Sequence, residues 1–215
     1  MKVAIAGGHG KIARLLEGLL VERGDAAVGL IRNPDHADDL REIGAEPVLC
    51  DLEQADSKEV AEAVAGADAV VFAAGAGPGS GVERKRTMDL GGALQLIEAA
   101  KANGISRYLI VSSMGAADPP AEGGDGFGEY LRAKAEADRA VAASGLDYTS
   151  VRPGRLTDDP GSGRVEVAPR LERGSIPRAD VAAVLLTCLD VENTIGRDFD
   201  LLSGETPIEE ALPAL

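Results

Sequence analysis

The sequence predicts an α/β protein with a doubly wound parallel sheet that is flanked by helices. Apolar runs of strand length alternate with helical stretches along the chain, which is typical of successive β–α–β units. Several of these runs are apolar at every position, as expected of strands buried on both faces of a sheet. The first run leads straight into a glycine-rich turn and then into an amphipathic helix. Together these observations predict a Rossmann-type fold.

The composition is that of one globular domain with a strong acidic charge. The chain has 215 residues, 45% hydrophobic and 3% aromatic, so we expect a single domain over residues 1–215 with an aliphatic core. A net charge of −14 argues against a nucleic-acid partner. No signal peptide is visible and no apolar run approaches the ~20 residues of a membrane span, so we expect a cytoplasmic protein with no membrane partner, as a monomer or homodimer. Cys50 and Cys188 lie in apolar stretches and are expected to be buried and reduced.

The N-terminal turn has the spacing of a dinucleotide-binding site. After an apolar run, Gly7, Gly10 and Ala13 recur at three-residue intervals at the start of a helix. Gly7 allows a tight turn, Gly10 lets a pyrophosphate approach the backbone, and the free amides of the helix favour negative charge. The alternative is a turn that only joins a strand to a helix. We expect cofactor contacts from the turn and the first helical residues, namely Gly7, His9, Gly10, Lys11 and Ile12.

The second and third strands predict how the adenosine half of the cofactor is held. Residues 26–31 form a strand that ends at Arg32, where a ribose-binding acid is expected about 20 residues after the glycine turn. Arginine suits a 2′-phosphate instead, so we expect NADP(H), with NAD(H) as the alternative if Arg32 is a solvated loop residue. Residues 47–50 form a strand that ends at Asp51 and Leu52. Asp51 either accepts a hydrogen bond from adenine or caps the next helix.

The rest of the chain continues the alternation of strands and helices. Residues 69–74 form a fully apolar strand that ends in a glycine-rich loop over 75–81, so Ala73, Ala74 and Gly75 are expected at the ligand. The basic run at 83–86 is expected to be a solvated first turn of a helix. The loop over 114–127 is expected to be among the more mobile segments. Further strands are predicted at 108–111, 148–151, 164–167 and 198–202, with helices at 57–65, 130–145 and 179–189.

One helix carries a candidate acid. Tyr130 and Lys134 are four residues apart and project from the same face. The ammonium favours the ionised form of the phenol, which eases proton donation to a carbonyl oxygen as a hydride arrives at carbon. Ser113, at the end of a strand, is placed to hold the same oxygen; the alternative is a pair of ordinary surface residues. His9 and His36 share no spacing with a carboxylate cluster, so no metal site is expected.

Taken together, these motifs resemble the short-chain dehydrogenase/reductase superfamily, in its small atypical branch of epimerase/dehydratase-like and NmrA-like proteins. The resemblance is carried by residues 7–13, 32–34, 51–52, 72–75, 89–93, 111–113, 130–134 and 151–154. It implies that Ser113, Tyr130 and Lys134 are catalytic and that Tyr130 and Lys134 also contact the cofactor, Lys134 through the nicotinamide ribose. It also implies that Pro153 and Gly154 line the nicotinamide end. Asp89 departs from the pattern, because related enzymes with a four-residue site often have Asn there.

The implied function is NADP(H)-dependent reduction or oxidation of a small carbonyl or alcohol compound. Residues from about 153 onward would form the substrate-side lobe, which is too short for the large substrates of sugar-nucleotide epimerases. The alternatives are a non-catalytic NmrA-like sensor of the NADP(H) redox state, which commonly lacks the Tyr/Lys pair, and an epimerase or isomerase with tightly held cofactor. We expect one main cleft, bordered by Gly7, Gly10, Ala74, Ser113, Tyr130 and Pro153.

Overall fold

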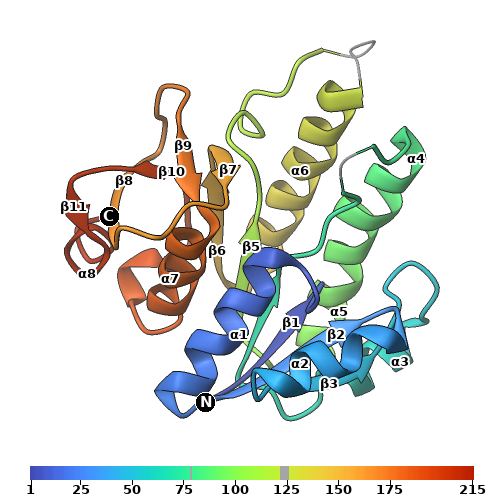
Figure 1. The fold of residues 1–215 in the computed structure, drawn as a ribbon. Coiled ribbons are helices and arrows are strands. Elements are labelled where there is room, and N and C mark those ends of the chain that lie inside the picture. The colour runs from blue at the N-terminus through green and yellow to red at the C-terminus, as the bar shows by residue number, and fades with distance from the viewer. Residues whose placement is uncertain (78, 122–125) are drawn as a thin grey trace.

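The fold is a predominantly parallel sheet covered by helices on both faces (Figure 1), as the sequence predicts. The computed structural model describes residues 1–77, 79–121 and 126–215. Within these ranges the main sheet has the strand order β11-β8-β10-β6-β5-β4-β1-β2-β3. Its strands are β1 (Lys2–Ala6), β2 (Ala26–Ile31), β3 (Glu46–Leu49), β4 (Ala69–Phe72), β5 (Arg107–Val111), β6 (Asp147–Pro153), β8 (Arg164–Ala168), β10 (Arg197–Ser203) and β11 (Thr206–Pro207).

The direction of winding reverses at β1, which lies between β2 and β4. Val3 pairs with Ala27 on one side and with Ala69 on the other, so the chain builds the sheet first toward β3 and then toward β10. Ligands bind at such a switch point in open α/β sheets, outside the carboxyl ends of the strands. All neighbouring strands from β3 to β10 run parallel, whereas β8 is antiparallel to both β10 and β11.

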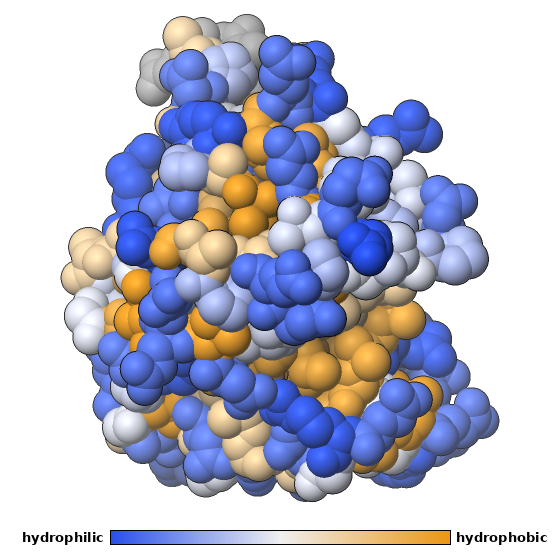
Figure 2. Space-filling model, turned by 90° about the vertical axis from the view of Figure 1, so that its left-hand side faces the viewer, coloured by the Kyte–Doolittle hydropathy of each residue, from blue (hydrophilic) through white to orange (hydrophobic). Residues whose placement is uncertain are grey.

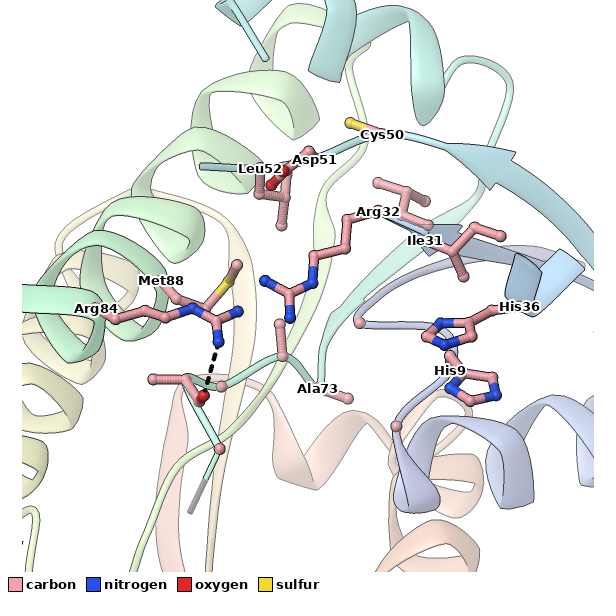
Figure 3. Close-up of a pocket in the computed structure, with 17 residues that line it drawn as sticks. His9, Ile31, Arg32, His36, Cys50, Asp51, Leu52, Ala73, Arg84 and Met88 are labelled. Carbon is pink, nitrogen blue, oxygen red and sulfur yellow. Dashed lines mark hydrogen bonds between the residues drawn. The ribbon is translucent and has the colours of Figure 1, made fainter. Parts of the chain in front are cut away.

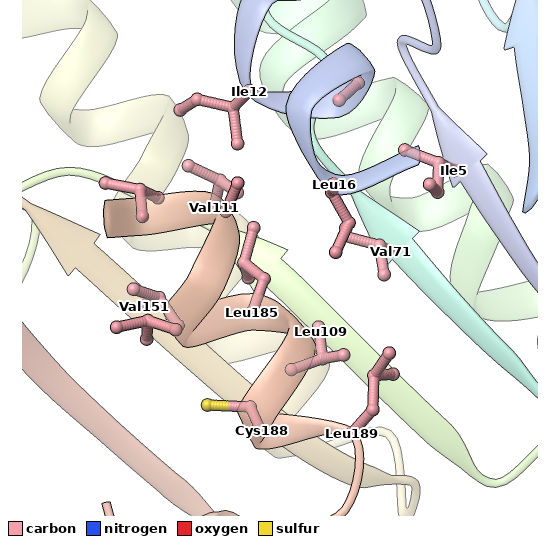
Figure 4. Packing of buried hydrophobic residues seen from close by; sticks show 14 of the residues in the cluster. Ile5, Ile12, Leu16, Val71, Leu109, Val111, Val151, Leu185, Cys188 and Leu189 are labelled. Carbon is pink, nitrogen blue, oxygen red and sulfur yellow. The ribbon is translucent and has the colours of Figure 1, made fainter. Parts of the chain in front are cut away.

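Two helical layers bury the apolar faces of the sheet. α1 and α7 cover one face, and α3, α5 and α6 cover the other (Figure 1). Figure 4 shows the first layer, in which Leu16 of α1 and Leu185 of α7 lie over Val71 and Leu109 of the sheet. The helices are α1 (Lys11–Arg23), α2 (Ala37–Glu42), α3 (Ser57–Ala63), α4 (Val82–Arg84), α5 (Ala93–Ala102), α6 (Gly126–Ala142), α7 (Arg178–Cys188) and α8 (Ile208–Ala211).

Burial follows the predicted pattern. β4 and β5 are buried at every position, as their uninterrupted apolar sequences predict. Cys50 and Cys188 are free, buried thiols, and burial raises the pKa of Cys50 to about 11 and that of Cys188 to about 12. In the described part of the chain, no helix combines the length and apolar character that a membrane crossing requires.

The C-terminal part of the chain contains elements that the sequence did not predict. β7 (Arg155–Thr157) and β9 (Ser175–Pro177) form a separate two-stranded parallel sheet, and α8 follows the short strand β11. Figure 2 views the molecule from this side: hydrophilic side chains cover most of the face, with apolar side chains gathered in hollows between them. Two predicted loops extend beyond the described residues, at position 78 and at 122–125, so the expected mobility of 114–127 stays a prediction.

Candidate cofactor and active site

The glycine turn leaves the first turn of α1 open to a ligand. Gly7 has a φ of +82°, and a Cβ atom there would lie 2.7 Å from the Cα atom of Ala74. Any other residue would therefore be strained and would push β1 away from β4. The amide of Gly10 donates to the Gly7 carbonyl oxygen at 2.7 Å, and no side chain caps the helix that follows. The free amides at the start of the helix can donate hydrogen bonds to an anion, as expected of a pyrophosphate site.

A cavity of about 300 Å³ lies above this turn at the carboxyl ends of β1, β2 and β4 (Figure 3). We call it the glycine-turn cavity. Of the predicted cofactor-binding residues, its lining includes Gly7, His9, Gly10, Arg32, Asp51, Leu52, Ala73, Ala74 and Gly75. Its lining does not include Ser113, Tyr130, Lys134, Pro153 or Gly154. The cavity therefore has only Gly7, Gly10 and Ala74 of the six residues expected to border one main cleft, and that part of the prediction is wrong for this cavity. Lys11 pairs instead with Asp158, and Ile12 is buried in the core.

Two arginines face each other across the cavity (Figure 3). Arg84 approaches Glu53 at 3.2 Å and Arg32 approaches the same carboxylate oxygen at 3.7 Å. Burial opposes the ionisation of Glu53, but hydrogen bonds from Thr87 and Arg84 and the charges of Arg84 and Arg32 hold its pKa below the usual value. The two guanidinium groups therefore share one negative charge and keep a net positive charge beside the cavity.

Arg84 corrects the prediction for the basic run at 83–86. The run does begin a helix, and Glu83 and Arg86 are exposed as expected. The guanidinium of Arg84, however, lines the cavity and donates to the carbonyl oxygen of Ala76 at 3.3 Å. Lys85 donates to the Gly126 carbonyl oxygen at 2.6 Å. A π-helical segment over Lys85–Gly92 interrupts the α-helical register between α4 and α5, and this change of period is not visible in the sequence.

Asp51 does not cap the following helix. α3 is capped by Asp56, whose carboxylate accepts from the amides of Lys58 and Glu59, while Glu59 reaches back to the Asp56 amide. Asp51 accepts instead from the amide of Glu53 at 3.0 Å and lines the cavity. The position of Asp51 therefore excludes the capping role and is compatible with the other expected role, contact with adenine.

Lys134 is buried at the back of the site, with three acceptors around its ammonium group. Its Nζ atom lies 3.0 Å from the carbonyl oxygen of Val111, 3.2 Å from Oδ1 of Asp89 and 3.5 Å from the carbonyl oxygen of Ala74. Asp89 is completely buried and also accepts from the Ala76 amide at 3.1 Å. Burial acts to lower the pKa of Lys134, but its interactions with Tyr130 and Asp89 raise it above the usual value, so the ammonium stays charged.

Tyr130 lies one helical turn before Lys134 and is half-buried. Its ring centroid is 5.9 Å from Lys134 Nζ and 5.9 Å from the ring of Phe127. Ser113 follows β5, is half-buried, and donates to the Met114 carbonyl oxygen at 3.4 Å. Ala74 connects the cluster of Ser113, Tyr130 and Lys134 to the glycine-turn cavity, because its carbonyl oxygen accepts from Lys134 and the residue lines the cavity.

The two predicted residues at the end of β6 have different surroundings. The carbonyl oxygen of Pro153 accepts from the Met114 amide at 3.0 Å, which joins β6 to the loop that carries Ser113. A Cβ atom at Gly154 would lie 2.4 Å from Leu202 and 2.6 Å from the carbonyl oxygen of Gly174. Close packing therefore already requires glycine at 154, whatever its role toward a cofactor.

Comparison with known proteins agrees with this geometry. Residues 7–192 match the family of NAD(P)H-binding proteins. The chain belongs to this family. It is 41% identical over 216 residues to YhfK of Bacillus subtilis, an uncharacterized sugar epimerase, with both chains covered completely. Among the solved structures that share its fold is a Bacillus halodurans protein described as a putative NAD-dependent epimerase/dehydratase (TM-score 0.93, 41% identity, both chains fully covered). Another is the anaerobilin reductase ChuY of Escherichia coli O157:H7 (TM-score 0.80, 25% identity, 95% of this chain and 98% of that one).

The nicotinamide cofactor of this NAD(P)H-binding family fits the residues of the site. The glycines would leave space for the dinucleotide backbone, the amides of α1 would hold its phosphates, and Arg32 and Arg84 would supply positive charge. In the described ranges, no group of three or more His, Cys, Asp or Glu side chains is arranged to hold a metal ion. The sequence predicted nine of the seventeen residues that line the glycine-turn cavity. Among the eight that it did not predict are the charged or polar side chains of His36 and Arg84.

Proposed function

We propose that this protein is an NADP(H)-dependent oxidoreductase that reduces, or forms by oxidation, a small carbonyl compound. One observation carries the proposal: the buried ammonium of Lys134 bridges the cavity wall at Ala74 to the helix that presents Tyr130. The family establishes that a nicotinamide cofactor binds. Arg32 at the end of β2 supports the choice of NADP(H) over NAD(H), because its guanidinium lines the cavity where a 2′-phosphate is expected.

The cofactor would lie across the switch point of the sheet. Its adenosine and pyrophosphate would occupy the glycine-turn cavity, and its nicotinamide would extend past Gly75 toward Ser113, Tyr130 and Pro153. When bound, the nicotinamide supplies or accepts the hydride. Lys134 already donates to the carbonyl oxygens of Val111 and Ala74 and forms an ion pair with Asp89. To hold the ribose as well, Lys134 would give up its longest contact, the 3.5 Å bond to Ala74.

The protein's own part of the reaction is the transfer of one proton. In reduction, the Tyr130 hydroxyl would donate its proton to the substrate oxygen as the hydride reaches carbon, which leaves an alcohol and a phenolate. The charged Lys134 stabilises that phenolate, and Asp89 keeps the lysine in place by its ion pair at 3.2 Å. Ser113 would donate a hydrogen bond to the same oxygen and orient it. Oxidation of the alcohol reverses each of these steps.

The two alternative functions are an epimerase or isomerase and a redox sensor. The relationship to a sugar epimerase supports an epimerase or isomerase, in which the cofactor returns its hydride and no net oxidation occurs. The relationship to an anaerobilin reductase supports net reduction. A redox sensor that binds NADP(H) without turnover would not need the Tyr130 and Lys134 pair, so their arrangement favours catalysis.

The proposal is tested by following NADPH oxidation with a panel of small aldehydes, ketones and quinones. Net oxidation of NADPH with formation of the matching alcohol or hydroquinone is the expected result. Conversion of a sugar or hydroxy acid without net change in NADPH would establish the epimerase instead. Tight NADPH binding with no product from any compound would establish the sensor and overturn the proposal.

A further inference from the structure

Another cavity of about 300 Å³ lies between α6, β6 and β10, and it shares no lining residue with the glycine-turn cavity. We call it the arginine cavity, because Arg139, Arg152 and Arg170 contribute to its lining. Its residues on α6 include Ala135 and Arg139, which lie four apart on a different face of the helix from Tyr130. The arginine cavity is therefore separate from both the glycine-turn cavity and the candidate acid.

The alternation of side chains along β10 forms one wall of the arginine cavity. Phe199 and Leu201 pack in the core on the side of α7, so Asp198 and Asp200 point to the opposite face, which α6 covers. Asp198 lines the cavity, whereas Asp200 is buried outside the lining and accepts from the amide of Leu171 at 3.0 Å. Short side chains leave the space open, because four of the lining residues are alanines, namely Ala116, Ala117, Ala135 and Ala142.

A buried arginine of β6 lines the cavity with donor capacity to spare. Arg152 is 5% exposed, and its Nε donates to Oδ2 of Asp138 at 2.9 Å. The carboxylate of Asp138 also accepts from the hydroxyls of Ser112 and Ser150, so three donors hold it in place. Nη1 of Arg152 lies 2.6 Å from Asp198 but makes no hydrogen bond. A guanidinium has more donors than these contacts use, so Arg152 can still bind an oxyanion.

Two exposed arginines of the lining have no acidic partner. Arg139 and Arg170 form no ion pair within the described part of the chain, and Arg170 donates to the carbonyl oxygen of Pro169 at 3.1 Å. Burial and the charge of Asp198 raise the pKa of Tyr148, so this phenol of the lining is neutral at neutral pH. The lining thus has three arginines against two aspartates, a surplus of one positive charge in a chain with a net charge of −14.

The end of β5 connects the arginine cavity to the candidate active site. The hydroxyl of Ser112 donates to Asp138 at 2.9 Å, and the amide of Ala116 donates to the carbonyl oxygen of Ser113 at 2.9 Å. Asp138 and Ala116 both line the cavity. A molecule in the cavity would therefore contact the turn that holds Ser113 without reaching the face of α6 that carries Tyr130.

We propose that the arginine cavity binds a small organic carboxylate as a second ligand, beside the candidate active site. The carboxylate would pair with the guanidinium groups of Arg139, Arg152 and Arg170, whose planar geometry matches it, and the apolar part would lie against the alanines. A surplus of one positive charge suits a monocarboxylate better than a phosphate monoester, which carries almost two negative charges. The volume suits a small molecule. The proposal goes beyond the proposed function, because no step of it needs the cofactor.

Amide NMR spectra of the full chain during titration with hexanoate are the first test. The signals of Ala116 and Ala117 should move along one saturable curve, while those of Gly7 and Gly10 stay in place. Hexanol, which has the same chain without the charge, should bind at least about ten-fold more weakly, and inorganic phosphate should also bind more weakly than hexanoate. The proposal would be overturned by the absence of a saturable shift, by shifts confined to the glycine turn, or by tighter binding of phosphate.

Four variants then separate a built site from general attraction to positive charge. Arg139→Gln and Arg170→Gln should each weaken hexanoate binding about ten-fold or more, and both side chains are exposed, so the fold should be kept. Arg197→Gln is the matched control, because Arg197 is exposed, precedes Asp198 on β10 and lies outside the lining. Ala142→Leu keeps every charge but fills the cavity, so it should weaken binding to a similar degree.

Equal losses in all three arginine variants, or unchanged binding in Ala142→Leu, would show that charge alone attracts hexanoate and would overturn the proposal. The affinity for NADPH should be the same in all four variants, because none of these residues lines the glycine-turn cavity. Failure of this inference is therefore distinguishable from failure of the proposed function.

Discussion

Replacing Glu17 with glutamine should make the stability of the protein much less sensitive to pH. Glu17 lies on α1 beneath the glycine turn, is fully buried, and neither carboxyl oxygen has a hydrogen-bond partner among the described residues. A Cβ atom on Gly29 would lie 2.5 Å from Oε1 of Glu17, so the glycine of β2 is what leaves room for the carboxyl group. Burial raises the pKa of Glu17 from 4.5 to about 8, although the charge of Arg14 acts to lower it.

The size of the effect follows from the difference in the pKa of Glu17 between the folded and the unfolded protein. The unfolded chain ionises Glu17 near pH 4.5, whereas the folded chain keeps it protonated up to about pH 8. Folding stability is therefore lost as the pH rises through this interval, by about 3 kcal/mol at pH 7 and about 5 kcal/mol above pH 8, at ~1.36 kcal/mol per pKa unit. Glutamine has nearly the same size and cannot ionise, so the variant should not show this loss.

Urea unfolding at pH 5 and pH 8 measures the prediction. The difference in unfolding free energy between Glu17→Gln and the wild type should change by about 4 kcal/mol between these two pH values, in favour of the variant at pH 8. Glu22→Gln is the matched control, because Glu22 lies on the same helix but is exposed. The buried amide adds a constant offset, so only the change with pH is diagnostic. An equal difference at both pH values would refute the reasoning.

Two further substitutions test the cofactor and the buried ion pair. Arg32→Ala should weaken NADPH binding by about 1.5–3 kcal/mol and leave NADH binding nearly unchanged, because it removes a charge-assisted phosphate contact. Isothermal titration of both cofactors measures the two affinities. Equal affinities of the wild type for NADPH and NADH would contradict the prediction. Asp89→Asn should lower the unfolding free energy by about 1–3 kcal/mol, because Lys134 loses a buried counter-charge but keeps an acceptor. The raised pKa of Lys134 means that its stabilising contribution is fully present below its unfolded-state pKa and is lost as the pH rises through the alkaline range. Without Asp89 the folded-state pKa should fall, so the variant should lose less of its stability over this range in thermal unfolding, and an identical pH profile would exclude this pairing.

The parts of the fold that the sequence predicts are those specified by local patterns. The apolar runs of β4 and β5 and the glycine turn have signals that lie within a few residues, and the structure has each of them where expected. Part of the lining of the glycine-turn cavity was predictable for the same reason, since Gly7, Arg32, Asp51 and Gly75 follow directly on predicted strands.

The parts that could not be predicted depend on contacts between distant segments. Arg84 faces the cavity next to a π-helical segment that changes the helix register, and no residue pattern in the sequence predicts that change. His36 joins the site only because β2 pairs with β1. The pairing of β7 with β9 and the antiparallel edge at β8 depend on how the last sixty residues fold back on the sheet.

Turnover and cofactor affinity of Tyr130→Phe, measured side by side, test the central claim most directly. Phenylalanine keeps the ring beside Phe127 and Lys134 but removes the acidic hydroxyl. With any compound that the wild type reduces, turnover should fall by a factor of about 10² to 10⁴, while the dissociation constant for NADPH should change little, because the phosphates and adenosine are held in the glycine-turn cavity. Undiminished turnover in Tyr130→Phe would contradict the account and remove this tyrosine from the reaction.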